Sequence, residues 1–136
     1  MLRVRVGCVV AVLFVAGMLG GCFLPTNRPP EALFTVTYNV DPADPLVVEF
    51  DASTSTDPDA DGIVSHSWVF GELVNILSPF EDTLSTATVA TPILVVRYPV
   101  EGTYTISLLV RDEQGASSAP FSRTITLPNL PVEPTL

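Results

Sequence analysis

Apolar and polar residues alternate along several short runs of the chain, with turn residues between the runs. The clearest run is Tyr104–Arg111, where apolar side chains occupy every second position from Tyr104 to Val110. A period of two predicts a strand with one buried face. Further strands are predicted at Leu33–Val40, Leu46–Asp51, Ile63–Phe70, Ile93–Tyr98 and Phe121–Leu127. Six or seven short strands in about a hundred residues, with no useful stretch of helical period, predict an all-β antiparallel sandwich.

Two aromatic residues make the predicted sandwich immunoglobulin-like, with about seven strands. Trp68 lies in the middle of the run Ile63–Phe70, where a large aromatic side chain fills a sandwich core. Tyr104 follows a glycine turn at the start of its strand, which is the position of a tyrosine corner, whose phenol bonds back to the backbone. Alternation places Val64 and His66 on the inward face with Trp68. We therefore expect His66 to be a half-buried packing residue.

The N-terminus has the pattern of an export signal. Two arginines precede the apolar run Val6–Leu19, which is too short to span a bilayer comfortably, and the run ends in Leu19-Gly20-Gly21-Cys22. This resembles a bacterial lipoprotein signal. The resemblance implies that residues 1–21 are removed and that Cys22 carries two or three acyl chains, a lasting membrane attachment. The alternative is a buried cysteine at the end of one hydrophobic anchor helix. Phe23 in place of aspartate favours the outer membrane, again by resemblance.

Composition sets the remaining boundaries and excludes some partners. Residues 22–31 are rich in proline and predict a short tether, residues 32–127 form the domain, and residues 128–136 are a second proline-rich, flexible segment. Removal of residues 1–21 takes two of the six arginines and none of the fifteen acidic residues, which leaves a net charge of −11. A chain without lysine or a basic cluster is a poor ligand for nucleic acid. It also has no cysteine pair left to form a disulfide.

Two longer blocks resemble a known family. Residues 50–71 read FDASTSTDPDADGIVSHSWVFG and residues 98–118 read YPVEGTYTISLLVRDEQGASS. Both blocks, in this order, resemble the PKD (polycystic kidney disease-type) domain, an immunoglobulin-like module of bacterial surface proteins. The resemblance implies protein–protein or protein–carbohydrate contact outside the cell. The segment Gly71–Pro92 departs from the family pattern, because it lies in a connection that is longer than usual. We expect an extra strand, hairpin or flap there.

The aspartates of the first block are candidate ligands for a metal ion. Asp57, Asp59, Asp61 and Gly62 match the first six positions of an EF-hand loop, but Trp68 stands at the twelfth position, which requires a bidentate glutamate. The loop is therefore not an EF-hand.

Two interpretations of this loop stay open. In the first, it is an acidic turn in which Asp57 and Asp59 make Asx-type bonds and Gly62 takes a positive φ. In the second, it is a looser calcium site of the kind that some bacterial PKD-type domains carry, with Asp61 and Asp112 as further ligands. Its affinity would fall in the weak extracellular class.

Catalysis is poorly supported. A carboxylate acid/base pair needs a buried member with a raised pKa, and a solvated loop offers little burial. The chain has one histidine and no lysine, and its cysteine spacing does not fit a zinc site. We predict a non-catalytic, membrane-anchored interaction module. A calcium-dependent glycan-binding lipoprotein is the alternative, and an enzyme that uses loop carboxylates is a third hypothesis.

The insertion supplies the candidate contact surface. Its apolar residues exceed what a loop needs, which indicates contact with another envelope protein or a polysaccharide, or else a cover over an open end of the sandwich. The candidate contact residues are Leu73, Val74, Ile76, Leu77 and Phe80. Alternation assigns Arg123 to the inward face of its strand. An arginine at such a position predicts either an edge strand with a snorkelling side chain or a β-bulge.

Overall fold

A computed structural model describes residues 26–130 of the 136-residue chain. This part consists of strands and loops, in agreement with the predicted all-β class. The strands are β1 (Thr35–Tyr38), β2 (Val47–Asp51), β3 (Ile63–Ser78), β4 (Asp82–Val89), β5 (Ile93–Arg97), β6 (Gly102–Asp112) and β7 (Phe121–Leu127). Among the described residues no helix has the length and apolarity to cross a membrane. The predicted signal segment, Cys22 and most of the C-terminal segment lie outside the described residues.

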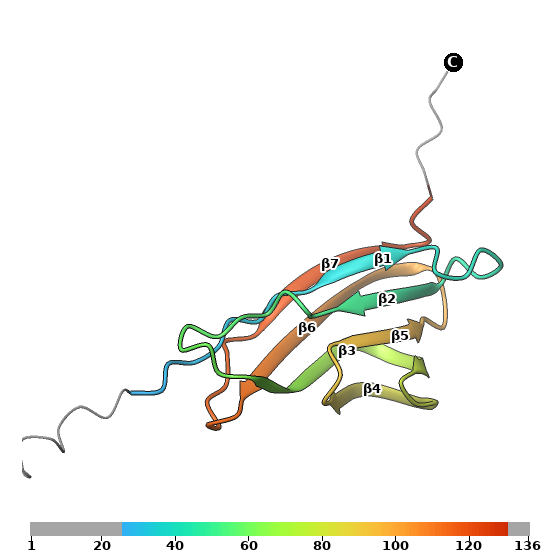
Figure 1. The fold of residues 1–136 in the computed structure, drawn as a ribbon. Coiled ribbons are helices and arrows are strands. Elements are labelled where there is room, and N and C mark those ends of the chain that lie inside the picture. The colour runs from blue at the N-terminus through green and yellow to red at the C-terminus, as the bar shows by residue number, and fades with distance from the viewer. Residues whose placement is uncertain (1–25, 131–136) are drawn as a thin grey trace, which may run out of the picture.

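All strand pairs are antiparallel, and β3 joins two layers (Figure 1). The strand order is β1-β2-β5-β3-β6-β7, and β4 pairs with β3. Residues Ile63–Val69 of β3 pair with β6, whereas Asn75–Ser78 pair with β5. Gly71 lies between these halves with a φ of 79°, and a Cβ there would lie 2.9 Å from the Thr105 carbonyl oxygen. Glycine is therefore needed where β3 leaves β6.

The insertion Gly71–Pro92 is a hairpin, one of the three forms expected for it. Its first part lengthens β3 and its second part forms β4. Val74 and Ile76 are each 1% exposed and belong to the core. The prediction that these two residues line a contact surface is wrong, because strand alternation turns them inward while Leu73 and Leu77 face outward. Leu73, Leu77 and Phe80 remain exposed.

Aromatic side chains fill the core between the layers. The Trp68 ring lies 5.6 Å from the Phe50 ring in a stacked pair and 5.1 Å from the Phe34 ring in an edge contact. The Tyr104 hydroxyl donates to the Val100 carbonyl at 2.6 Å, which confirms the predicted tyrosine corner. Tyr98 is fully buried, donates to the Phe70 carbonyl at 3.1 Å, and has its pKa raised by burial. The core thus satisfies its two phenols through backbone carbonyls.

The inward face of β3 differs from the prediction at one position. Val64 is exposed, because the register between β3 and β6 shifts between Ile63 and Ser65 and a β-bulge turns it outward. His66 is more buried than expected, with 4% of its surface exposed. Burial lowers the pKa of His66, against backbone hydrogen bonds with Val89 and Ala90 that act to raise it.

Arg123 follows the first of its two predicted explanations. The register between β7 and β6 is unbroken, and β7 is an edge strand. The exposed Arg123 side chain donates through Nη1 to the Phe34 carbonyl at 3.2 Å. An edge position therefore explains the arginine, and a bulge does not.

Candidate functional site

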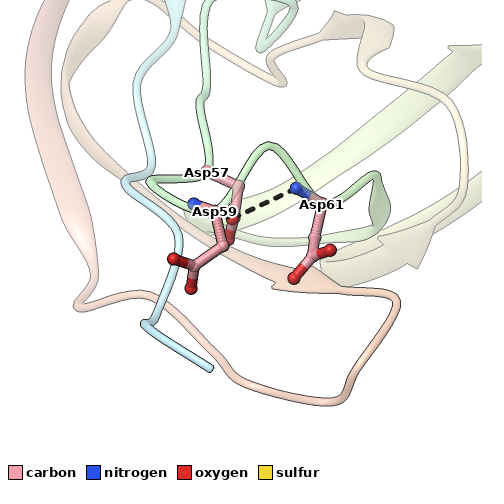
Figure 2. A group of neighbouring side chains, drawn as sticks. All are labelled: Asp57, Asp59 and Asp61. Carbon is pink, nitrogen blue, oxygen red and sulfur yellow. Dashed lines mark hydrogen bonds between the residues drawn. The ribbon is translucent and has the colours of Figure 1, made fainter. Parts of the chain in front are cut away.

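The aspartate loop between β2 and β3 is organised by the first of its aspartates (Figure 2). Asp57 Oδ1 accepts hydrogen bonds from the backbone N–H of Asp59 at 2.7 Å and of Asp61 at 3.2 Å. The N–H of Ala60 also donates to the Asp57 carbonyl at 3.2 Å. This is the Asx-type turn expected of Asp57. The positive φ, however, belongs to Ala60 at 62° and not to Gly62, so that detail of the prediction is wrong.

Asp59 is bound by the segment that precedes the first strand, instead of making an Asx bond of its own. The Arg28 N–H donates to Asp59 Oδ2 at 2.6 Å, and Arg28 Nε donates to Asp59 Oδ1 at 2.8 Å. Arg28 Nη2 reaches the Pro58 carbonyl at 2.8 Å. The backbone and side-chain bonds from Arg28 lower the pKa of Asp59. Both oxygens of this carboxylate are therefore used within the chain.

The same N-terminal segment belongs to the folded domain. Glu31 and Thr56 exchange backbone hydrogen bonds at 2.7 and 3.1 Å, and the Leu33 N–H donates to Ser55 Oγ at 3.0 Å. With the Arg28 contacts, these bonds attach the segment to the aspartate loop. The domain boundary predicted at residue 32 therefore lies several residues too late, because residues 27–31 belong to the folded domain and not to a tether.

Asp61 faces the turn that follows β6. Its Oδ2 accepts a hydrogen bond from Gln114 Nε2 at 2.6 Å, and the next residue, Gly62, accepts one from the Glu113 N–H at 2.9 Å. One carboxylate oxygen from each of Asp57, Asp59 and Asp61 lies within 4.8 Å of the other two. Three of the four predicted ligands are thus brought together.

Asp112 does not join this group of three. It is only 1% exposed, its Oδ1 accepts from the Ala116 N–H at 2.9 Å, and its Oδ2 accepts from Asn27 Nδ2 at 3.0 Å. Burial acts to raise the pKa of Asp112, but the hydrogen bonds, that from Asn27 first among them, prevail and lower it. Its role is to hold Asn27, a residue that we did not predict at this site because it lies in the proline-rich segment.

Two oxygen atoms at this end of the molecule are left without a hydrogen-bond donor. Asn27 Oδ1 and Asp57 Oδ2 are buried, and no described residue donates to either. Buried oxygens are usually paired, so each of these has unused capacity to accept a proton donor or a cation. Asn27, but not Asp57, lines a cleft of about 490 Å³ at this end of the molecule. Its lining residues are Thr26, Asn27, Arg28, Pro58, Asp59, Asp61 and Gln114.

Comparison with known proteins gives the family. No curated protein matches the chain. One similar solved structure comes from a study of the promiscuous specificity of carbohydrate-binding modules of the β-sandwich superfamily. It is 36% identical, with a TM-score of 0.51, and the match covers 75% of this chain but only 35% of that one.

Two isolated domains are also similar. The PKD1 domain of Vibrio anguillarum Epp is 27% identical, with a TM-score of 0.48 and coverage of 74% of this chain and 95% of that one. The PKD1 domain of the Vibrio cholerae metalloprotease PrtV is also 27% identical, with a TM-score of 0.46 and coverage of 73% and 96%. The sequence model of the PKD domain matches residues 27–127, and the chain therefore belongs to the PKD domain family.

Proposed function

We propose that the protein is a non-catalytic binding module outside the cytoplasm, held to a membrane by lipid on Cys22. The observation that carries this proposal is the family match over residues 27–127. The similarity to a structure from a study of carbohydrate-binding modules supports contact with a protein or a carbohydrate. The lipid anchor is supported by the order of basic residues, apolar run and small-small-cysteine at the N-terminus.

The lipid anchor would place the aspartate loop close to the membrane. The segment from Asn27 onward is bonded to the domain, which leaves Phe23–Thr26 between Cys22 and the folded body. Four residues can span at most about 14 Å. The domain would therefore present the end that carries the aspartate loop to the bilayer and its β3–β4 turn away from it, because this turn lies at the opposite end in Figure 1. Leu73, Leu77 and Phe80 would then be available as contact side chains on the far side.

Calcium fits the membrane-facing end. The hard oxygen donors that a calcium ion requires are offered by Asp57 Oδ2 and Asn27 Oδ1, which accept no hydrogen bond, and by Asp61. Asp59 is already engaged by Arg28 and would add charge more than a ligand bond. Bound calcium would supply positive charge between the N-terminal segment and the loop. With so few protein ligands and water completing the shell, affinity would fall in the class of about 10⁻⁴–10⁻³ M.

The anchor and the partner can be tested together. Intact-mass spectrometry of the chain purified from membranes should show a first residue, Cys22, that carries diacylglycerol. Cross-linking in intact cells, followed by capture of the full chain, should recover the same partner repeatedly, and more of it with calcium than with chelator. Asp57→Asn should remove the calcium effect, whereas Asp41→Asn, at the other acidic turn, should keep it. An unmodified Cys22, or capture of nothing above background, would contradict the proposal.

Carbohydrate contact is a second candidate, favoured by the 36% identity to the structure from the carbohydrate-binding study. Affinity electrophoresis of the full chain in gels with neutral polysaccharides measures it directly, because a bound chain migrates more slowly. Retardation that is lost with chelator and with Asp57→Asn would assign the calcium-dependent form. Equal mobility in every gel would leave protein contact as the better explanation.

A further inference from the structure

The described part of the molecule has three strands that are paired on one side only. They are β1, which pairs with β2, β7, which pairs with β6, and β4, which pairs with β3. The open side of such a strand carries unpaired N–H and C=O groups and is a template for another strand. Natural sheets protect these edges with short strands, proline, charge or a covering segment.

The edges of β1 and β7 carry such protection. β1 has only four residues and follows the pair Pro29-Pro30. β7 lies between Pro120 and Pro128. The Arg123 guanidinium of β7 donates to the carbonyl of Phe34, which immediately precedes β1. These two edges are therefore tied to one another and bounded by proline.

The edge of β4 lacks this protection. The strand has eight residues, and its sequence from Thr83 to Val89 is TLSTATV, without proline and without a charged residue. It pairs with β3 near both of its ends, so its backbone is extended over most of its length. Threonine and valine, which have high strand propensity, make up four of its eight residues. This is the edge at which another strand can add.

Charge does not oppose a second copy at this edge. The chain has a net charge of −9, so two copies repel each other over most of their surface. Between Thr83 and Val89 that repulsion has no local source, and an antiparallel pair of β4 strands would place neutral side chains opposite neutral side chains. The exposed residues there are Thr83, Ser85, Thr86 and Thr88.

Hydroxyl pairs across strands are already the pattern of this surface. Ser67 and Thr88 share a hydrogen bond at 3.0 Å between β3 and β4. Thr105 and Thr124 do so at 3.1 Å, and Ser107 and Ser122 at 2.6 Å, between β6 and β7. Such pairs stabilise neighbouring strands in a sheet. Two β4 strands related by a twofold axis would continue these rows, since a self-complementary edge gives a closed dimer.

We propose that β4 is the interface of a symmetric dimer of this chain, formed by antiparallel β4–β4 pairing. The layer of each copy that contains β3 and β6 then joins the same layer of the other copy, and the two form one continuous sheet. The interaction is made by the backbone, with the hydroxyl rows on its surface. It goes beyond the binding function proposed above and does not depend on Cys22, because β4 lies in the part of the chain whose fold is described.

Sedimentation velocity of the full chain in detergent tests the dimer. The wild-type chain should sediment as a concentration-dependent dimer. Thr86→Lys, at an exposed position of β4, should raise the dissociation constant by about tenfold or more, because two lysines then face each other near the twofold axis. This variant lowers the net negative charge, so general charge repulsion would predict the opposite change. The matched control is Thr37→Lys on the edge strand β1, also exposed, which should dimerise like the wild type.

Hydrogen exchange keeps the test decisive if the lysine variant folds poorly. In the wild-type chain the amides of Thr83–Val89 should gain protection as protein concentration rises, while those of β1 do not. A wild-type chain that stays monomeric at all concentrations overturns the proposal, and so does Thr86→Lys with unchanged association. Protection of β4 amides that appears only with added envelope extract would assign the edge to another protein and likewise overturn it.

Discussion

Two acidic turns at opposite ends of β2 have nearly the same sequence and nearly the same local bonding (Figure 1). One is Asp41-Pro42-Ala43-Asp44 and the other begins Asp57-Pro58-Asp59-Ala60. In each, the first aspartate accepts a hydrogen bond from the N–H two residues later, at 2.8 Å for Asp41 and 2.7 Å for Asp57. In each, the carbonyl of that aspartate also accepts from the N–H three residues later. Asp-Pro therefore sets the turn in both places.

An arginine from a distant part of the chain completes both turns. Arg97 of β5 binds Asp44, and Arg28 binds Asp59. The difference is that the second turn has a third carboxylate, Asp61, and a buried Asp57 Oδ2 without a donor. The first turn has no such oxygen, whereas Asp57 Oδ2 in the second turn can still accept a proton donor or a cation. The Asp-Pro motif alone therefore makes the turn, whereas the candidate metal site depends on residues outside this motif.

Calcium should produce the largest difference between the two turns. If the loop binds it, calcium at 100 times its dissociation constant stabilises the domain by about 2.7 kcal/mol, because only the folded state holds the site. Asp57→Asn should abolish this gain, whereas Asp41→Asn should retain it. Thermal unfolding of the full chain with calcium and with chelator measures the effect. Magnesium is the control ion, because its need for near-ideal octahedral geometry suits a loose site poorly. Equal melting temperatures with calcium and chelator would leave the acidic turn as the correct interpretation.

Much of the fold could be predicted from the sequence because its signals are local. Alternation in Tyr104–Arg111 identified the inward face of β6, and the glycine before Tyr104 identified the tyrosine corner. Val64 was misplaced because a β-bulge shifts the register and leaves no mark on the pattern of apolar residues. Val74 and Ile76 were assigned to a surface because the length of β3 beyond Gly71 depends on its pairing with β5. The burial of these residues depends on pairing between strands that are distant in the sequence, which the local periodicity does not show.

The candidate site was predictable only in its loop. Asp57, Asp59 and Asp61 stand out as a motif in the sequence. Asn27 and Arg28 come from a proline-rich segment about thirty residues earlier, and nothing local indicates that this segment folds back on the loop. Asp112 was expected as a ligand from its place at the end of a strand, but its two oxygens are taken by Asn27 and Ala116.

Alanine substitutions in the absence of metal should separate the turns by a smaller amount. Asp57→Ala removes two hydrogen bonds to backbone N–H groups, one of them partly buried, and should destabilise the domain by about 1–2 kcal/mol. Asp41→Ala removes one exposed bond and should cost about 0.5–1 kcal/mol. Urea unfolding with chelator present gives both values. A larger cost at Asp41 would show that the similarity of the two turns does not extend to their energies.

The smallest effect concerns acid, to which both turns should respond in the same direction. In the folded protein hydrogen bonds from Arg97 and from Arg28 hold the pKa of Asp44 and Asp59 below the ordinary value of 3.8. A lowered folded-state pKa means that each carboxylate stabilises the domain fully above 3.8 and loses this contribution as the pH falls through the lower folded value. Arg28→Gln and Arg97→Gln should therefore each flatten the loss of stability below about pH 4. Both ion pairs, neither of which is buried, should weaken further in high salt.

Urea unfolding between pH 7 and pH 3, in chelator, measures these slopes. Arg28→Gln keeps the Arg28 backbone N–H, which lowers the pKa of Asp59 most, so this variant should flatten the acid limb less than Arg97→Gln does. The double variant should flatten it by the sum of the two effects, since the pairs lie at opposite ends of the molecule. A clearly greater effect of Arg28→Gln would mean that this arginine also neutralises Asp57 or Asp61. It would then act as the counter-cation of the whole aspartate loop, and its removal should strengthen calcium binding. Arg97→Gln is the matched reference for that outcome, because Asp44 has no third carboxylate beside it in the described part of the chain.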